Sequence, residues 1–404
     1  MLIIENSKTT LKRFHEFKPK SIRYKNDDDY AEHYRELLDK SVACRMRCST
    51  PVSIMLSGGM DSNSIVPFAV KHNPHKKKTR AISWTFNKLQ QCDEREYIDK
   101  AIEMYDLIKI QFNADDLWPL KNKDKFFNNP GTPMENPYRE LKENIYSLCI
   151  ENGSRLIFNG WYSDRFYAGS DLWLTDLIKD KKISRFINDL VWLIGEEGLF
   201  NLRSSQPARN LFSFLKFLKP KRNPTDNYSW LTDFSKSQIH ETLIDKTTYQ
   251  YFSNPKRIQN MLSAIGFFGQ SSEHFHLSNH SIELECPYRD IRLVEFMMNI
   301  PSYQLYNKGT KKYIAKNAMK NLLPDKILNR NSPTLLTPLF NLGMQDKEVE
   351  WIESILSSSD EWDKYIKRGE VLNSLRNKNQ PGRKELIVWQ CISFINWTNS
   401  HSYN

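Results

Sequence analysis

The chain has 404 residues, of which 39% are hydrophobic and 26% are charged, and its formal net charge is +10. Because this length exceeds the size at which a single core stops growing, we expect one large domain with a second lobe. No apolar run approaches the length of a membrane span, and the opening MLIIENSKTTLKRF lacks the apolar segment and cleavage site of a signal peptide. We therefore expect a soluble, cytoplasmic protein with no membrane partner.

The first half of the chain alternates between helix and strand patterns. Apolar residues at helical spacing predict a helix over 26–48, and a short buried strand then ends at Ile54, Met55 and Leu56. The next expected elements are helices over 64–70, 93–106 and 138–153 and strands over 80–86, 107–112 and 154–160. Four strands separated by helices predict an α/β fold with a doubly wound parallel sheet.

The later part of the chain is expected to be mostly helical. We divide the chain into an N-terminal extension over 1–27, an α/β core over 28–175 and a mostly helical part over 176–404 that completes the same domain. A helix is expected to begin at Gly309-Thr310 and to end at Leu322-Leu323-Pro324.

The loop after the first core strand reads Ser57-Gly58-Gly59-Met60-Asp61-Ser62. A strand that enters a helix through two glycines leaves backbone N–H groups free to bind an anion, and the serines add hydroxyl donors. Asp61 would repel phosphate oxygens unless a cation lies between them, so the loop indicates a phosphate chain together with Mg²⁺. The alternative is an ordinary turn in which Ser and Asp cap the helix.

Other candidate sites are weaker. The six cysteines, Cys44, Cys48, Cys92, Cys149, Cys286 and Cys391, are thinly spread, and we expect reduced, structural thiols. His274, His276 and His280 lack the carboxylate-rich helix pattern of a metal site. The basic clusters over 75–80 and 216–222 carry no interleaved aromatic residues, so we interpret them as solvated surface and consider a nucleic-acid partner unlikely.

The segment LSGGMDS resembles the pyrophosphate-binding loop of the ATP pyrophosphatases. Residues 28–340 resemble one branch of them, the synthetase domain of asparagine synthetase, together with the β-lactam synthetases and lasso-peptide cyclases. The resemblance implies an adenine nucleotide α-hydrolase-like fold that uses ATP and Mg²⁺. It also implies activation of a carboxylate as an acyl-adenylate, release of pyrophosphate and attack by an amine. The candidate nucleotide contacts are Leu56, Ser57, Gly58, Gly59, Asp61, Ser62, Ser83, Gly160 and Ser163.

A second loop, NGWYSDRFYAG over 159–169, is similar to the family's Gly-x-Gly-x-Asp-Glu segment. The resemblance implies that Asp164 joins Asp61 as a metal ligand, whereas Asp164 taken alone is an ordinary capping residue. Trp161 and Tyr162 replace smaller family residues, and Arg165 stands where asparagine synthetases usually carry Glu. We therefore expect a carboxylate substrate other than aspartate.

The segment HSIELECPYRDIRLVEFMMNIP over 280–301 resembles a further family block, in which Glu283 and Asp290 match the two acids. Glu283 is a candidate for orienting groups or for acting as a base, and pairing with an arginine is an equally good role for it. Arg330 matches a family arginine, but Ser332 stands where the family has a lysine. Either Lys312 or Lys326 supplies the cation, or Arg330 replaces it, or the second half-reaction is altered or lost.

No Cys-led glutaminase domain precedes the helix at 28, so we expect the chain not to hydrolyse glutamine itself. The nucleophile would be free ammonia, ammonia from a partner protein, or an amine of a small-molecule or peptide carboxylate substrate. Two other functions stay open: a tRNA-modifying ATP pyrophosphatase and a non-catalytic nucleotide-binding relative.

Overall fold

The computed structural model describes residues 2–6, 8–12, 15–75, 78–125, 131–133, 135–198, 201, 205–215, 229–238, 255, 257, 258, 261, 267–330, 332–376 and 383–401. The basic cluster over 216–222 lies outside these residues, as do two lysines of the cluster over 75–80.

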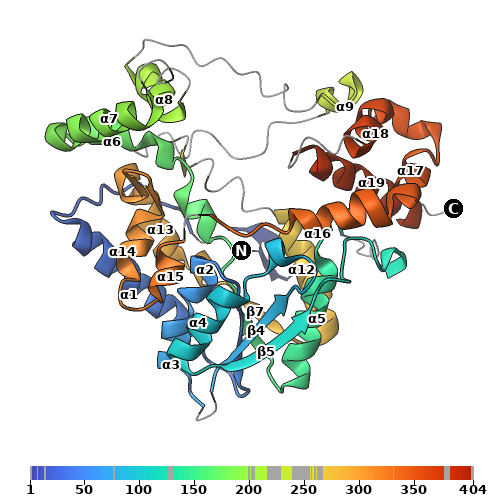
Figure 1. Cartoon of the computed structure of the whole chain (residues 1–404), viewed down its shortest axis with the longest axis horizontal. Coiled ribbons are helices and arrows are strands. Elements are labelled where there is room, and N and C mark those ends of the chain that lie inside the picture. Colours follow the sequence, from blue (N-terminus) through green and yellow to red (C-terminus); the bar gives the residue numbers. More distant parts are fainter. Residues whose placement is uncertain are drawn as a thin grey trace.

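A five-stranded parallel sheet organises the fold (Figure 1). In spatial order its strands are β5 (Ile108–Asn113), β4 (Arg80–Thr85), β3 (Val52–Met55), β6 (Leu156–Phe158) and β7 (Glu283–Glu285). The four predicted strands and the doubly wound arrangement are confirmed. The sequence does not predict β7, because a three-residue strand Glu-Leu-Glu offers no apolar run.

The strand order places a switch point between β3 and β6. From β3 the chain moves outward through β4 to β5, and it then returns to add β6 on the other side of β3. The register pairs Val52 with Leu156 and Ile54 with Phe158, so the loops that follow β3 and β6 begin side by side. Ligands of open α/β sheets bind in the crevice that such diverging loops form.

Alternate residues of the strands face two different cores. Ile54 and Phe158 contribute to the core on one face, whereas Met55 and Ile157 contribute to the core on the other. The helices of the first core are α1 (Asp27–Arg45), α3 (Val66–Lys71), α4 (Arg95–Tyr105), α13 (Ile291–Asn299) and α14 (Tyr313–Ala318), and those of the second are α5 (Arg139–Glu151) and α12 (Phe267–His280). Helices on both faces define the doubly wound class.

The helix α1 illustrates how the local sequence sets an element. Asp29 Oδ2 accepts a hydrogen bond from the Asn26 N–H at 3.2 Å, and three aspartates occupy the first turn. These charges are favourable at the positive end of the helix dipole, and Arg45 in the last turn is favourable at the other end. Apolar residues along one side, including Leu38 and Val42, are fully buried in the first core.

Two further groups of helices lie on opposite sides of the view in Figure 1. The first group is α6 (Trp173–Lys179), α7 (Ile183–Glu197) and α8 (Gln206–Phe214), and the second is α16 (Thr337–Asn341), α17 (Val349–Leu356), α18 (Arg368–Arg376) and α19 (Arg383–His401). Each group has a core of its own, centred on Trp173 and Leu177 in the first and on Trp389 and Ile392 in the second.

The predicted helix from Gly309 to Pro324 is wrong in its extent. β8 (Tyr306–Asn307) and β9 (Thr310–Lys311) pair as an antiparallel hairpin, α14 follows, and α15 spans Asp325–Leu328. Lys312 and Asn321 have φ angles of 56° and 65°, which no right-handed helix accommodates. The break has a functional consequence, because it sets Lys312 at the start of α14.

The two domain boundaries proposed from the sequence stay predictions, and the sheet draws strands from both sides of residue 175. An antiparallel hairpin of β1 (Leu2–Glu5) and β2 (Lys8–Leu11) begins the described chain. Within the described ranges, no helix combines the length and the apolar character needed to cross a membrane.

Candidate functional site

The loop after β3 is held by its own polar groups. The Ser62 hydroxyl accepts a hydrogen bond from the Ser57 N–H at 3.1 Å and lies 3.0 Å from the Ser57 hydroxyl. The Asn63 amide donates to the carbonyl oxygens of Ser57 and Gly59 at 2.8 and 2.7 Å. The loop is therefore rigid in the form described, with the short helix α2 (Met60–Asn63) starting directly after Gly59.

Two glycines lie in close contact with other parts of the chain, and the contact of the second requires glycine. A Cβ on Gly58 would lie 2.7 Å from Arg330 Nη1, and a Cβ on Gly160 would lie 2.6 Å from the Ser62 nitrogen and 2.8 Å from the Asp61 carbonyl carbon. Because the second clash is with backbone atoms, no side-chain rotation relieves it. Gly160 thus allows the loop after β6 to lie directly on the loop after β3.

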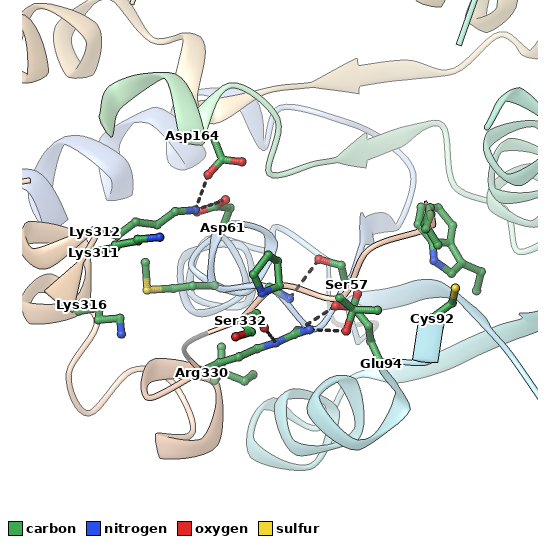
Figure 2. Close-up of a pocket in the computed structure, with 17 residues that line it drawn as sticks. Ser57, Asp61, Cys92, Glu94, Asp164, Lys311, Lys312, Lys316, Arg330 and Ser332 are labelled. Carbon is green, nitrogen blue, oxygen red and sulfur yellow. Dashed lines mark hydrogen bonds and ion pairs between the residues drawn. The ribbon is translucent and has the colours of Figure 1, made fainter. Parts of the chain in front are cut away.

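This approach brings two carboxylates onto one cation. Lys312 Nζ lies 2.7 and 2.6 Å from the two carboxylate oxygens of Asp61 and 2.7 Å from Asp164 Oδ1 (Figure 2). The Ser163 hydroxyl donates to Asp61 Oδ1 at 2.9 Å, and the Tyr288 hydroxyl donates to the Asp61 carbonyl oxygen at 2.9 Å. Three distant segments therefore meet at Asp61.

The protonation states follow from this cluster. Burial raises the pKa of Asp61, Lys312 acts against that shift, and Asp164 adds to it. Burial would lower the pKa of Lys312, but the two carboxylates outweigh burial and hold the pKa above its usual value. When both acids are ionised, two carboxylates and one ammonium carry a net negative charge, which attracts a divalent cation. The donor set of Asp61 and Asp164 thus fits Mg²⁺.

Two cavities adjoin the cluster and share Ser57, Asp61, Trp84 and Asp164. The first, of about 530 Å³, is lined by more cations than anions. Its charged residues are Lys311, Lys312, Lys316, Arg330, Asp61, Glu94 and Asp164 (Figure 2). The second, of about 720 Å³, lies between the loops after β3 and β6. An anionic chain in the first cavity would meet lysines, and an apolar group in the second would meet Leu56 and Trp84.

Arg330 is held by several partners at the wall of the first cavity. Its Nη1 lies 2.8 Å from Glu94 Oε1, its Nε donates to the Ser332 carbonyl oxygen at 2.9 Å, and its Nη2 donates to Thr334. The guanidinium carbon lies 4.2 Å from the centre of the Tyr97 ring. Glu94 in turn accepts from the Gly58 N–H at 3.0 Å, so the pair supports the loop after β3.

Most of the residues predicted for the site lie together. The predicted residues that line the two cavities are Leu56, Ser57, Gly59, Asp61, Ser62, Gly160, Asp164 and Arg330. Gly58 and Ser163 support the same loops from outside the cavities. Ser83 does not reach either cavity: it is 2% exposed, and its hydroxyl accepts from Gln111 Nε2 at 3.3 Å. The neighbouring Trp84 lines both cavities, because successive strand residues face opposite ways.

The two predicted acids of the third block lie elsewhere. Glu283 begins β7 and pairs with Leu156, at the end of the sheet opposite to the ligand crevice. Asp290 caps α13 by accepting from the Arg292 N–H at 3.0 Å, and it also pairs with Arg45 at 3.0 Å and with the Arg292 guanidinium at 2.7 Å. Neither acid lines the two cavities, so the geometry gives both a structural place and no contact with a reacting group.

Five residues of the site were not singled out as ligands by the sequence: Trp84, Glu94, Lys311, Lys316 and Tyr288. Glu94 is an acid at the start of a helix, and that position is typical of an ordinary capping residue. Tyr288 matches a family aromatic position, but nothing in the sequence indicates that its hydroxyl reaches Asp61.

The histidines do not form a metal site with their neighbours. His276 Nε2 lies 3.1 Å from Glu135 Oε2, and His280 Nε2 lies 2.5 Å from Glu143 Oε2. The side chain of His274 is outside the described residues. In the part of the chain that is described, no group of three or more His, Cys, Asp and Glu side chains could hold a metal ion. The described cysteines are all free thiols.

Replacing Gly160 by alanine tests the contact between the two loops. The added Cβ would overlap the backbone of Asp61 and Ser62, so we expect the free energy of unfolding to fall by about 1–3 kcal/mol. Affinity for inorganic pyrophosphate, measured by calorimetry, should fall with it. Gly195→Ala in α7 is the matched control, since nothing lies within 4 Å of its Cβ. Equal stability and equal affinity in the two variants would contradict the contact.

Asp290→Asn tests whether this acid is structural. Burial would raise the pKa of Asp290, but hydrogen bonds from Arg292 and Arg45 lower it to about 2. The carboxylate therefore stabilises the fold above about pH 4, its ordinary range, and loses that effect as the pH falls toward 2. Asp290→Asn should lower the free energy of unfolding by roughly 1–3 kcal/mol at pH 7.

The pH dependence gives the check. In urea unfolding measured from pH 7 down to pH 3, the difference between wild type and Asp290→Asn should shrink as the pH falls. Asp116→Asn is the control, because the Asp116 carboxylate is exposed and the variant loses only one ion pair, that with Lys88 at 3.8 Å. A stability gap that widens in acid would contradict the assignment.

The chain is similar to known proteins over most of its length. The family model described as Asparagine synthase matches residues 33–399. Glutamine-hydrolyzing asparagine synthetases 1 and 3 of Bacillus subtilis (strain 168) are 23% and 24% identical to the chain, over 94% and 82% of its length. The chain covers 60% and 52% of those relatives.

A solved structure, the U34-tRNA thiolase NcsA from Methanococcus maripaludis, aligns at 13% identity with a TM-score of 0.24, over 64% of this chain and 82% of that one. A TM-score this low supports no conclusion about fold or function. The family match spans most of the described chain, including both loops and the segment that carries Lys312. The chain belongs to the asparagine synthase family.

Proposed function

We propose that the chain is an ATP-dependent carbon–nitrogen ligase that activates a carboxylate as an acyl-adenylate. An oxygen of the carboxylate attacks the α-phosphorus of ATP, the bond between the α-phosphorus and the bridging oxygen breaks, and pyrophosphate leaves. Ammonia or a substrate amine then attacks the acyl carbon and displaces AMP, with loss of a proton. The observation that carries the proposal is the cluster of Asp61, Asp164 and Lys312 at the switch point between β3 and β6.

The charge pattern of the first cavity supports pyrophosphate as the leaving group. Among the described residues, Lys311 and Lys316 line the cavity without an acidic partner, and Lys312 is shared between two carboxylates. Burial lowers the pKa of Lys316, so its ammonium gains from an anion beside it. Fixed cations that face a developing negative charge are often the largest contribution to catalysis.

Mg²⁺ fits the same cluster. Asp61 and Asp164 would hold the ion, and when bound it supplies charge neutralisation to the phosphate chain. The ion and the Lys312 ammonium compete for the same carboxylate oxygens. We therefore expect Lys312 to exchange its carboxylate partners for phosphate oxygens when the metal and the nucleotide are both present.

The contacts of the three candidate cations support one of them in place of the lysine that the family has at position 332. Lys326 pairs with Glu96 and does not line the cavity. The Arg330 guanidinium is committed to Glu94, Thr334 and the Ser332 carbonyl. Lys312 faces the cavity beside both metal-binding carboxylates, which supports it as the cation that acts on the phosphate chain.

The amine donor belongs to the proposal as well. An ammonia-supplying partner protein, free ammonia and an amine of the substrate itself are all compatible with two cavities that open on the same carboxylates. A small-molecule or peptide acid would enter the second cavity. Release of AMP only in the presence of one of these amines would identify the donor.

Asp61→Asn tests the nucleotide site without knowledge of the acid. Because one of the two ligand carboxylates becomes neutral, Mg²⁺-dependent binding of ATP should weaken by about tenfold or more. Calorimetric titration of wild type and variant, each with Mg²⁺ and with EDTA, measures it. Asp116→Asn again serves as the control. In turnover with a competent acid the nucleotide product should be AMP; ADP would contradict adenylation, and ATP binding without any AMP would favour the non-catalytic alternative.

Lys312→Met tests the competition between ammonium and metal. Removing the ammonium frees both carboxylates, so affinity for Mn²⁺ alone should rise several-fold while affinity for pyrophosphate falls by about tenfold. Lys326→Met is the matched control and should change neither. Electron paramagnetic resonance of free Mn²⁺ and calorimetry with pyrophosphate give the two readouts. Parallel loss of both affinities would show that Lys312 only holds the loops together.

A further inference from the structure

A third cavity adjoins the 720 Å³ cavity, which the acid would enter. It has a volume of about 150 Å³, and its walls are mostly apolar, with Phe17, Phe166, Met261 and Val294 among them. Tyr162 and Arg165 line both this cavity and the 720 Å³ cavity, so the two are neighbours across these side chains. We call it the tail cavity.

The tail cavity is tied directly to Asp61. Tyr288, which is 1% exposed, places its ring in the wall of the tail cavity and donates its hydroxyl to the Asp61 carbonyl oxygen at 2.9 Å. The Phe166 ring packs edge-on against it with centroids 5.9 Å apart. A group in the tail cavity would therefore lie one side chain away from the residue that binds the metal.

Two arginines stand at the boundary of the tail cavity. The Arg289 guanidinium carbon lies 5.3 Å from the centre of the Tyr162 ring. The Arg165 side chain has no acidic partner among the described residues, although it lies next to Asp164 in the chain. An acid that approaches Asp61 and Asp164 is repelled by both carboxylates. A planar guanidinium at the boundary offsets that repulsion and binds a carboxylate through two hydrogen bonds.

The backbone at this boundary is strained. Tyr162 has a φ of 73°, in the left-handed region that favours glycine, and such outliers gather at ligand sites. Tyr162 lines both cavities, so the strained residue lies at the boundary that the substrate would span.

We propose that the carboxylate substrate carries one compact apolar group, of the size of a benzene ring or a branched four- to five-carbon chain. The group occupies the tail cavity, and the reacting carboxylate lies at Arg165. A cavity of about 150 Å³ with apolar walls holds one benzene molecule, which sets the size. This inference rests on the proposed function, since it names the class of acid that the same site activates.

Exchange of labelled pyrophosphate into ATP tests the proposal with a panel of acids: phenylacetate, 3-methylbutanoate, acetate, aspartate and 1-naphthylacetate. Phenylacetate and 3-methylbutanoate should support exchange at least tenfold better than acetate and aspartate, and 1-naphthylacetate should be too large. Phe17→Ala enlarges the cavity and should admit 1-naphthylacetate. Phe234→Ala, a partly exposed phenylalanine on α9 (Asp233–Ser237), is the matched control and should not.

Arg165→Gln and Arg165→Lys test the carboxylate contact. The glutamine variant should raise the KM for phenylacetate by about tenfold with little change in kcat, and the lysine variant should recover part of the loss because it keeps the charge. Equal KM values in wild type and both variants would remove Arg165 from the substrate site and overturn that part of the proposal.

Failure of this inference is distinguishable from failure of the proposed function. Exchange with aspartate but not with phenylacetate would overturn the tail cavity as the acid site and leave adenylation intact. If no acid supports exchange and Mg-ATP does not bind, the proposed adenylation is contradicted. Calorimetry with phenylacetate alone then tests the tail cavity as a binding site. If the wild type binds phenylacetate and Ile291→Trp, at the cavity rim, does not, the tail cavity is supported as the binding site. If the wild type does not bind phenylacetate, the inference is overturned.

Discussion

The site depends on one close approach, that of Gly160 to the backbone of Asp61 and Ser62. The approach is possible because β3 and β6 are neighbours in the sheet and their loops begin side by side. Because Gly160 has no Cβ, the two loops lie closer together than a residue with a side chain would allow. The carboxylate cluster follows from this contact, because the contact brings the loop that carries Asp164 against Asp61.

The second constraint is electrostatic. Two carboxylates brought together cost free energy: burial raises the pKa of Asp61, and the neighbouring Asp164 raises it further. The chain compensates with Lys312, which comes from the end of the β8–β9 hairpin and has a left-handed φ of 56°. A right-handed helix through this position would direct the side chain elsewhere. The break in the expected helix is thus part of the site, and the strain at Lys312 is offset by two ion pairs.

The sequence predicts local elements and cannot predict where distant side chains meet. The strand that ends at Met55 and the Gly-Gly loop are visible because apolar runs and glycines act over a few residues. The resemblance to family motifs predicted that Asp61 and Asp164 lie close together, and both contact Lys312 because each follows one of two neighbouring parallel strands. Their role as metal ligands stays a prediction. Glu283 shows the limit: it begins β7, a strand too short to be predicted, and it lies at the end of the sheet away from the two cavities.

Ser332 shows that a site can keep its positive charge even though the family's lysine at that position is absent. Arg330 lies two residues away, but Glu94 and Thr334 use its donors, and its guanidinium packs on Tyr97. Lys312 and Lys316 are four residues apart and line the same cavity, and Lys311 lies beside them. The electrostatic energy depends on the distance between a cation and the charge that it stabilises. It does not depend on which position in the sequence supplies the cation. For that reason a serine at position 332 does not by itself contradict the proposed adenylation.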